Sequence, residues 1–478
     1  MKKIVGLLLL VCLYTGAYAK FVNVGDAKNV AFHYMQTVSN IENADVLQLI
    51  YTGSSELDGA HVTDFYVFGL QGATGFVMIA ADDNIVPVLA YSTDNNFNAT
   101  HIPDNVANWL QGYKMQINDV IHRNYVAGEA VKAQWSGLVT GVNLHIAAKT
   151  TYGQVGPLFG ILWGQQTFYD SLCPYDYNAG ARTITGCVAT AMAQVMRYWK
   201  WPATGTDSNS YYPPNSSLGL QSVNYTQQHY MWDSMPYNLS KNNFHVANLM
   251  YSCGVSVNMQ YGVTESGSYV TNSQYPGYNT AEHALPTYFR YSNTIHGEDR
   301  ANYTDSQWIQ MIYNELVARR PIIYSGYGSV GGHCFVLNGC DKSYRFYFNW
   351  GWTGNSNGYY TLDALNPGGM DFNSSHSAIF SIYPDTMAPA RIQPIAVNSV
   401  QDIVVSPNPA NKLLQIQATN SIDQIVIIDL NGKIWMDEKQ SVPLKFASIN
   451  TAALPVGIYT LKTICEGHAT LQKIVIAR

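Results

Sequence analysis

Charged side chains are scarce in this sequence. Lys, Arg, Asp and Glu make up only 12% of the 478 residues, about half the share found in a typical globular protein. The net charge at pH 7 is −6, whereas a nucleic-acid-binding chain would carry an excess of positive charge. Instead, 35 tyrosines and many Asn, Ser and Thr residues keep the surface polar. The composition therefore argues against nucleic acid as a partner.

Cysteine is also sparse, since the whole chain holds seven. This number is too small for the disulfide framework of an exported protein of this size. The sequence contains no Cys-x-x-Cys pair, and Cys334 and Cys340 lack a matching second pair, which argues against a structural zinc site. We therefore expect neither a metal nor a cofactor. The six cysteines beyond the N-terminal segment are Cys173, Cys187, Cys253, Cys334, Cys340 and Cys465.

Long apolar runs are missing except near the N-terminus. There the run Ile4–Leu13 follows two lysines and precedes Ala17-Tyr18-Ala19. This order is typical of a secretory signal peptide over residues 1–19, and the run is too short to cross a membrane. We expect a chain that is exported through the periplasm and has no transmembrane segment.

The next part of the chain, residues 20–149, has the pattern of a small α+β domain. Its apolar residues recur with helical or strand period in four stretches. The predicted helices are Asp26–Val38 and Asn105–Arg123, and the predicted hairpin strands are Phe65–Leu70 and Gly75–Ala81. Lys132–Gln154 is weakly patterned, and we interpret it as a linker.

Two further domains follow. Residues 150–384 form the largest unit, with a helical first part and a strand-rich last part, which is typical of an α+β fold. Residues 385–400 contain two prolines and no period, so we interpret them as a linker. Residues 401–478 contain about seven short β-rich runs, which predict a small β-sandwich.

The segment Thr183–Pro202 carries the strongest candidate for catalysis. Its apolar residues fall on one face of a helix that begins at Cys187. Free amide groups at a helix start favour the thiolate, which is the reactive form of cysteine. A buried cysteine that acts as a small hydrophobic residue is an equally good interpretation of this segment by itself.

A nucleophilic cysteine needs a base, and His333 stands out among the histidines because two glycines lead into a strand there. If Asp341–Ser343 is the turn of a hairpin, Cys340 lies opposite Tyr344. His333 and Asn349 are then diagonal neighbours on one face of the sheet, within reach of a side-chain hydrogen bond. This spacing predicts an arrangement of nucleophile, base and orienting amide.

Other residues near these positions could support the reaction. Trp350 and Trp352 follow Asn349 directly and could shield the imidazole from water. The alternative is that Asn349 caps a hairpin and the tryptophans are core residues. An oxyanion needs hydrogen-bond donors, which the backbone amide of Cys187 and the side chain of Gln165 or Gln166 could provide. The alternative is that both glutamines are ordinary surface residues.

Several of these runs resemble the streptopain family of papain-like cysteine peptidases. Thr185–Met196 is similar to the family's catalytic-cysteine helix and Val330–Val336 to its histidine strand. Phe348–Gly354 is similar to its Asn-Trp-Gly-Trp segment, and Gly358–Pro367 is similar to the residues that follow that segment. Trp163–Gln165 resembles the Trp-Asn-Gln-Gly stretch. That likeness implies that Gln165 is the oxyanion glutamine, although Gly164 and Gln166 depart from the family's pattern.

The resemblance extends beyond the catalytic unit. Thr74–Asp83 and Val88–Ser92 resemble the family's inhibitory propeptide, while Ser406–Pro409 and Leu454–Tyr459 resemble the sorting domain of the type IX secretion system. Together they imply a papain-like domain between a propeptide and a secretion tail. The implied protein is a secreted endopeptidase, made as a zymogen, that acts on proteins or peptides, is inhibited by its own propeptide and uses the type IX machinery.

Two alternatives remain open from the residues. An amidase or acyltransferase would use the same Cys-His-Asn site, and a surface adhesin could use a papain-like scaffold without catalysis. For the zymogen, we expect the propeptide to displace His333 through the glycine-rich loop Tyr324–Gly332, because such a loop can hold two positions.

Overall fold

The computed structural model describes residues 21–141, 153–328, 331–362, 376–387, 403–429, 433–465 and 468–477. The chain divides into two compact units, Met1–Ala388 and Pro389–Arg478. Within the first unit we call residues 21–141 the N-terminal region and residues 153–387 the central region. The predicted signal peptide and the predicted boundary at residue 149 lie outside the described residues. No helix in the described ranges is long and apolar enough to cross a membrane.

One antiparallel sheet of ten strands runs through both regions of the first unit. Its strand order is β1-β2-β3-β4-β13-β12-β11-β10-β14-β9. The N-terminal region supplies β1 Leu47–Leu57, β2 Ala60–Leu70, β3 Phe76–Ala80 and β4 Val88–Ser92. The central region supplies β9 His296–Asp299, β10 Ile322–Gly328, β11 Gly331–Cys340, β12 Phe346–Asn349, β13 Gly358–Tyr360 and β14 Ser377–Phe380. The two regions meet where β4 pairs with β13.

The N-terminal region has three helices: α1 Val24–Ser39, α2 Asp104–His122 and α3 Glu129–Thr140. Helices α1 and α2 pack on the sheet, and α3 packs against α1. The first two confirm the predicted helices, and the antiparallel pair β2–β3 confirms the predicted hairpin. The prediction that Lys132–Gln154 is a linker is wrong at its start, because α3 extends to Thr140 and buries Val131 and Trp135. Weak periodicity concealed this helix, since few of its residues are buried.

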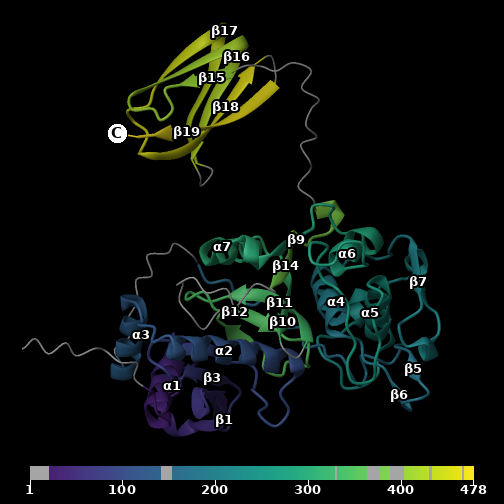
Figure 1. Ribbon diagram of the computed structural model, residues 1–478. Helices are drawn as coiled ribbons and strands as arrows, with labels where there is room; N and C mark the ends of the chain where they lie inside the picture. Colours follow the sequence, from purple (N-terminus) through teal and green to yellow (C-terminus); the bar gives the residue numbers. More distant parts are fainter. Residues whose placement is uncertain are drawn as a thin grey trace, which may run out of the picture. The chain divides into compact units, whose positions relative to one another are not determined.

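Helices of the central region pack on both faces of β10 and β11. Helix α4, Cys187–Trp199, contacts one face, while α2 and α7, Asp305–Val317, contact the other. Figure 1 shows α2 lying along the strands of the central region, with α4 and its neighbours α5 Phe244–Ser256 and α6 Ala281–Phe289 farther right. Each face has its own hydrophobic core. Helix α2 is therefore buried on two sides, by its own region and by the central one.

Short elements complete the central region. They are the paired strands β5 Tyr175–Asp176 and β6 Ala181–Arg182, the paired strands β7 Ser208–Tyr211 and β8 Gln221–Asn224, and single turns of 3-10 helix. Those turns are Ser216–Leu218, Tyr225–Gln227, Trp232–Ser234, Arg300–Asn302 and Asp385–Met387, and a further turn, Ala44–Val46, precedes β1.

The hairpin β11–β12 differs from the prediction by one residue. Tyr344 belongs to the turn, with φ +60°, and Asp341 pairs with Arg345 across it. A three-residue turn that ends in a left-handed residue is a common hairpin connection. This turn places Cys340 opposite Phe346, two residues from the prediction, and an irregularity between Leu337 and Cys340 takes one residue back. Val336 rather than Phe335 therefore lies opposite Asn349. Because side chains alternate, a shift of one residue moves Asn349 to the other face of the sheet.

The second unit holds five described strands rather than about seven short ones. They are β15 Ile403–Ser406, β16 Leu413–Asp429, β17 Ile434–Asn450, β18 Gly457–Cys465 and β19 His468–Ile476. The β-rich prediction is confirmed, but β16 and β17 are each 17 residues long and take the place of several short strands. Register shifts along the β16–β17 pair explain why the pattern suggested shorter pieces. The unit has its own apolar core.

A separate core predicts independent stability. Deleting residues 389–478 should leave the unfolding temperature of the remaining chain unchanged, because none of its core residues is removed. Calorimetry of the full and shortened chains measures this. A lowered unfolding temperature of the first unit would contradict it.

Candidate active site

Cys187 lies at the N-terminus of α4, after Gly186 with φ +85°. A side chain at Gly186 would place its Cβ 2.7 Å from the Met259 sulfur and 2.8 Å from the Ser266 carbonyl oxygen. Glycine is therefore required both by the backbone conformation and by the close packing of this turn. The turn fixes where the Cys187 thiol points.

Burial raises the pKa of the Cys187 thiol, although the backbone N–H groups of Cys334, Val188 and Cys187 itself act in the opposite direction. The thiol is therefore protonated in this form of the chain. Our expectation that the helix start would favour a thiolate is wrong here, because burial outweighs the amide groups and no cation among the described residues offsets it. The contact with Cys334 N–H also places the thiol directly against strand β11.

His333 lies on β11, opposite Gly326 of β10, next to the residue whose N–H contacts the Cys187 sulfur. Successive side chains of a strand point to opposite faces. Cys334 belongs to the core on the α4 side, and Phe335 belongs to the core on the α2 side. His333 therefore shares the α2 side with Phe335, and the described residues show no hydrogen bond between its imidazole and Cys187.

Helix α2 holds the imidazole on this side. The amide nitrogen of Asn108 hydrogen-bonds Nε2 of His333, which must act as the acceptor and so carries no proton. Burial lowers the pKa of His333 to about 4, which also favours the neutral ring. In this form, the nitrogen that would accept a proton from the thiol is occupied by Asn108.

A second histidine, His376, contacts the next residue of α2. The Trp109 ring stacks on the His376 ring, with centroids 5.2 Å apart and an interplanar angle of 18°. Nδ1 of His376 lies 3.1 Å from the Tyr324 hydroxyl. Burial, with help from Arg300, lowers the pKa of His376 to about 3. Both histidines are thus kept neutral beneath α2.

Asn349 lies on the α4 side of the sheet, opposite Val336. Its Nδ2 donates to the Ile161 carbonyl oxygen at 2.7 Å, and its Oδ1 accepts from Gly351 N–H at 3.2 Å. The predicted neighbourhood of His333 and Asn349 on one face is therefore wrong for this form. The structure brings Cys187 and Asn349 to the same face and leaves His333 on the other.

The two tryptophans after Asn349 differ in burial. Trp350 is fully buried, its Nε1 donates to Ser356 O at 3.0 Å, and its ring lies 4.7 Å from that of Phe335. Its carbonyl oxygen accepts a 2.7 Å hydrogen bond from Asn105 of α2. Trp352 is half-buried and packs against the same core. Helix α2 therefore also contacts the segment that carries these tryptophans.

Gln165 is only 3% exposed, whereas Gln166 is exposed. The Gln165 carbonyl oxygen accepts a 3.0 Å hydrogen bond from Thr185 N–H, two residues before Cys187. This bond ties the glutamine segment to the turn that leads into α4. It supports Gln165 over Gln166 as the residue near the thiol.

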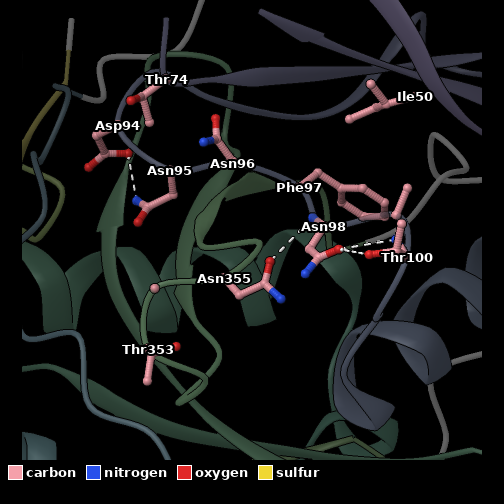
Figure 2. A pocket seen from close by; sticks show the side chains of 12 residues that line it. Ile50, Thr74, Asp94, Asn95, Asn96, Phe97, Asn98, Thr100, Thr353 and Asn355 are labelled. Carbon is pink, nitrogen blue, oxygen red and sulfur yellow. Dashed lines mark hydrogen bonds between the residues drawn. The ribbon is translucent and has the colours of Figure 1, made fainter. Parts of the chain in front are cut away.

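The loop after Trp352 is fastened to the N-terminal region. Asn98 N–H donates to Asn355 Oδ1 at 3.2 Å, and Ser356 N–H donates to Asn96 O at 2.9 Å. Figure 2 shows the Asn355 side chain pointing toward Asn98. Both residues line a pocket of about 750 Å³. Residues of both regions line it, so this cavity exists only while the N-terminal region is in place.

The predicted glycine-rich loop Tyr324–Gly332 is mostly a β-hairpin. Tyr324 to Gly328 belong to β10, and Gly331 begins β11, with Gly328 opposite Gly331. Residues 329–330 lie outside the described residues. The expectation of a loop is therefore wrong for most of this stretch, because backbone pairing between β10 and β11 organises it.

Comparisons with known proteins decide the family. Streptopain of Streptococcus pyogenes is 30% identical over 391 residues, which cover 76% of this chain and 92% of streptopain. The model of the peptidase C10 family matches residues 163–360. This chain belongs to the peptidase C10 family. The match to the family model includes Cys187, His333, Asn349 and Gln165.

Two other family models match outside this region. Residues 19–117 match the Spi protease inhibitor, and residues 404–477 match a secretion system C-terminal sorting domain. This C10 chain is therefore a secreted cysteine endopeptidase made as a zymogen. Residues 19–117 are its propeptide domain, and we call the form described here, which retains them, the latent form.

Other relatives agree. The thiol protease/hemagglutinin PrtT of Porphyromonas gingivalis is 29% identical over 435 residues, or 89% of this chain, and the chain spans about half (47%) of PrtT. A prointerpain A fragment of Prevotella intermedia, with a cysteine-to-alanine substitution, has 32% identity and a TM-score of 0.54. That match covers 70% of this chain and 99% of the fragment.

Sequence reasoning missed the residues by which the propeptide reaches the site. Asn105, Asn108 and Trp109 lie in a correctly predicted helix, but only its apolar face was assigned to a core. The available signal was that these positions of α2 carry amide and indole side chains rather than charged ones. His376 had no local signal, because only the tertiary structure brings it beneath Trp109.

The two neutral histidines predict that acid weakens latency. Their pKa values in the latent form, about 4 and about 3, lie below the usual value, so the released state binds more protons as pH falls. Latency is complete above about pH 6.5 and is lost toward pH 4, by up to about tenfold per pH unit for each histidine. Hydrogen exchange of α2 amides in the Cys187→Ala chain, corrected for intrinsic pH effects, measures this.

A His376→Phe variant serves as the control, because it retains a ring against Trp109 but removes one titrating group. Its pH dependence should be shallower by one proton. Exchange of α2 that stays constant between about pH 7 and pH 5 would show that neither histidine couples to release.

Proposed function

We propose that this enzyme cleaves peptide bonds with Cys187 as nucleophile and His333 as general base, after α2 withdraws. The supporting observation is that the Cys187 sulfur already contacts the backbone N–H of Cys334, the residue beside His333. The imidazole therefore has to move from one face of β11 to the other, rather than across the molecule. Gly331 and Gly332 directly precede it and make such a change of backbone conformation accessible.

In the active form, His333 takes the proton of the thiol, and the thiolate attacks the carbonyl carbon of the substrate. The imidazolium then returns the proton to the leaving amine, which leaves an acyl-enzyme on Cys187. Water, activated by the neutral imidazole, releases the acid product and regenerates the thiol. The imidazolium formed next to the thiolate also lowers the thiol pKa, which burial alone raises in the latent form.

We assign two donors to the oxyanion formed in each attack. One is the Cys187 backbone N–H at the start of α4, and the other is the Gln165 side chain. Both belong to segments that the Thr185–Gln165 backbone hydrogen bond joins. Donors held in place before the reaction stabilise the developing charge without reorganisation.

Asn349 is proposed to orient the imidazole in the active form. It already lies on the face that holds Cys187, which is the face His333 must reach. In the latent form its amide is bound to Ile161 O and Gly351 N–H. Trp350 and Trp352, which follow it, would then border the reacting groups and limit access of water.

The proposed partners follow from the three regions. Protein or peptide substrates bind to the central region, and the propeptide inhibits it by holding His333 through Asn108. The tail is recognised by the type IX secretion machinery.

In its native host, a chain that lacks residues 389–478 should not be exported, although the purified enzyme should remain active.

Variants test the catalytic assignment. Cys187→Ala and His333→Ala should each lower peptide hydrolysis by at least about 10³-fold, because each removes a group that makes or breaks a bond. Asn349→Ala should retain part of the activity and shift the acidic limb of the pH profile. Hydrolysis of casein by processed protein, with circular dichroism to verify folding, measures this. Substantial activity of folded Cys187→Ala would exclude the nucleophile assignment.

The two glutamines provide a matched pair for the oxyanion site. Gln165→Ala should lower kcat by about 10²–10³-fold with a smaller effect on KM, since the donor acts mainly in the transition state. Gln166→Ala should be close to neutral, because its side chain is exposed. The reverse result would move the oxyanion donor by one residue.

A further inference from the structure

A second contact between propeptide and enzyme lies far from the reactive residues. Arg345 and Asp341 flank the turn between β11 and β12 and are only 5% and 8% exposed. They form an ion pair of 3.5 Å. His333 lies seven residues before Cys340 on β11, a distance of roughly 20 Å along a strand. The ion pair is therefore at the opposite end of the strand from the site that α2 blocks.

Propeptide groups complete the hydrogen bonding of this buried pair. Nε and Nη2 of Arg345 both donate to the Val88 carbonyl oxygen, at 3.1 and 3.0 Å. Nη1 donates to the Tyr34 hydroxyl at 3.3 Å, and the guanidinium lies 5.2 Å from the centre of the Tyr34 ring. The Tyr91 hydroxyl donates to Asp341 at 3.2 Å. These contacts involve charged groups, which make the stronger hydrogen bonds of proteins.

Strand pairing adds to the same contact. Tyr91 of β4 lies opposite Tyr359 of β13, and the two rings stack with centroids 5.1 Å apart and an interplanar angle of 14°. The other neighbour of β13 is β12. If β4 left, β13 would become an open sheet edge, which is a surface that accepts an extended strand.

The contact at α2 is less well satisfied than the one at Arg345. Asn108 Oδ1 and Trp109 Nε1 are buried without a hydrogen-bond partner among the described residues. Leaving buried polar atoms unpaired weakens an interface. The polar groups of the propeptide are thus paired more completely around Arg345 than around His333.

We propose that the Asp341–Arg345 pair and the β13 edge form an anchoring site that keeps the propeptide bound after the chain is cut between α3 and residue 153. Such a cut removes none of the contacts at this pair or at β13. The occupant is this chain's own cut propeptide, held through strand β4 and the hydroxyls of Tyr34 and Tyr91. Latency therefore outlasts the cut, and activation requires a second event that removes β4. The inference rests on the proposed inhibition by α2, but retention itself does not require an active Cys187.

The experiment uses the full chain with Cys187→Ala, cut by a trace of mature wild-type enzyme. Size-exclusion chromatography should show the cut propeptide eluting with the enzyme. In the same background, Tyr34→Phe and Tyr91→Phe should each speed its dissociation by about tenfold, because each removes a hydrogen bond to a charged group. Tyr51→Phe, in strand β1, is the matched control and should leave the rate unchanged.

Asn108→Ala separates retention from inhibition. In a chain with native Cys187, the cut Asn108→Ala propeptide should remain bound while peptide hydrolysis begins without delay. If Asn108→Ala alone released the propeptide, or if the unaltered propeptide eluted separately at once, the anchoring site would be refuted. If the Asn108→Ala chain lost latency while its propeptide still eluted with the enzyme, the anchoring site would be supported. Retention of the propeptide and inhibition by α2 can therefore fail separately.

Two more results bear on the occupant. Arg345→Lys keeps the charge but loses the paired donation to Val88, so it should also speed dissociation, and circular dichroism would verify its fold. A dimer of propeptide-free enzyme that Tyr359→Ala abolishes would show that the edge takes a second copy instead. That outcome, with rapid loss of the propeptide, would overturn the proposal.

Discussion

The face of strand β11 on which His333 lies is the constraint on which the rest of the site depends. The Cys187 thiol approaches this strand from the α4 side and contacts Cys334 N–H, while Asn108 holds the imidazole on the α2 side. A thiol that is buried without a neighbouring imidazolium stays protonated. A histidine buried against an amide stays neutral. The opposite facing of the two side chains thus accounts for both protonation states and, under the proposed function, for latency.

The continuous sheet explains how His333 is kept on the α2 side of β11. The propeptide does not merely cover a cleft, because β4 extends the enzyme's own sheet through β13, and α2 packs against both parts. Amide side chains on a buried helix face are tolerated only where partners exist. Asn105 and Asn108 find them in Trp350 O and His333, both of which belong to the enzyme. Helix α2 of the propeptide therefore packs against its own region and against the central region at the same time.

Buried polar groups are paired unevenly over the interface between the propeptide and the enzyme. A buried ion pair loses much stability when its hydrogen bonds are removed, and the propeptide supplies several of those made by Arg345. At α2, by contrast, some polar atoms have no partner. An inhibitor whose polar groups are better paired at Arg345 than at His333 can stay attached there while α2 withdraws from His333.

The sequence by itself determined the elements with strong local periodicity: α1, α2, α4 and the β2–β3 hairpin. It also singled out Cys187 and His333, because a helix start and a Gly-Gly-His strand are local patterns. The register of β11 and β12 was decided by the turn that ends at Tyr344 and by an irregularity between Leu337 and Cys340, neither of which periodicity reveals. Their net shift of one residue placed Asn349 on the other face. The pairing of Tyr91 with Tyr359, and the contact of α2 with His333, join residues far apart in the chain. Only the tertiary structure decides such contacts, because their free energy comes from surfaces that do not exist until both regions have folded.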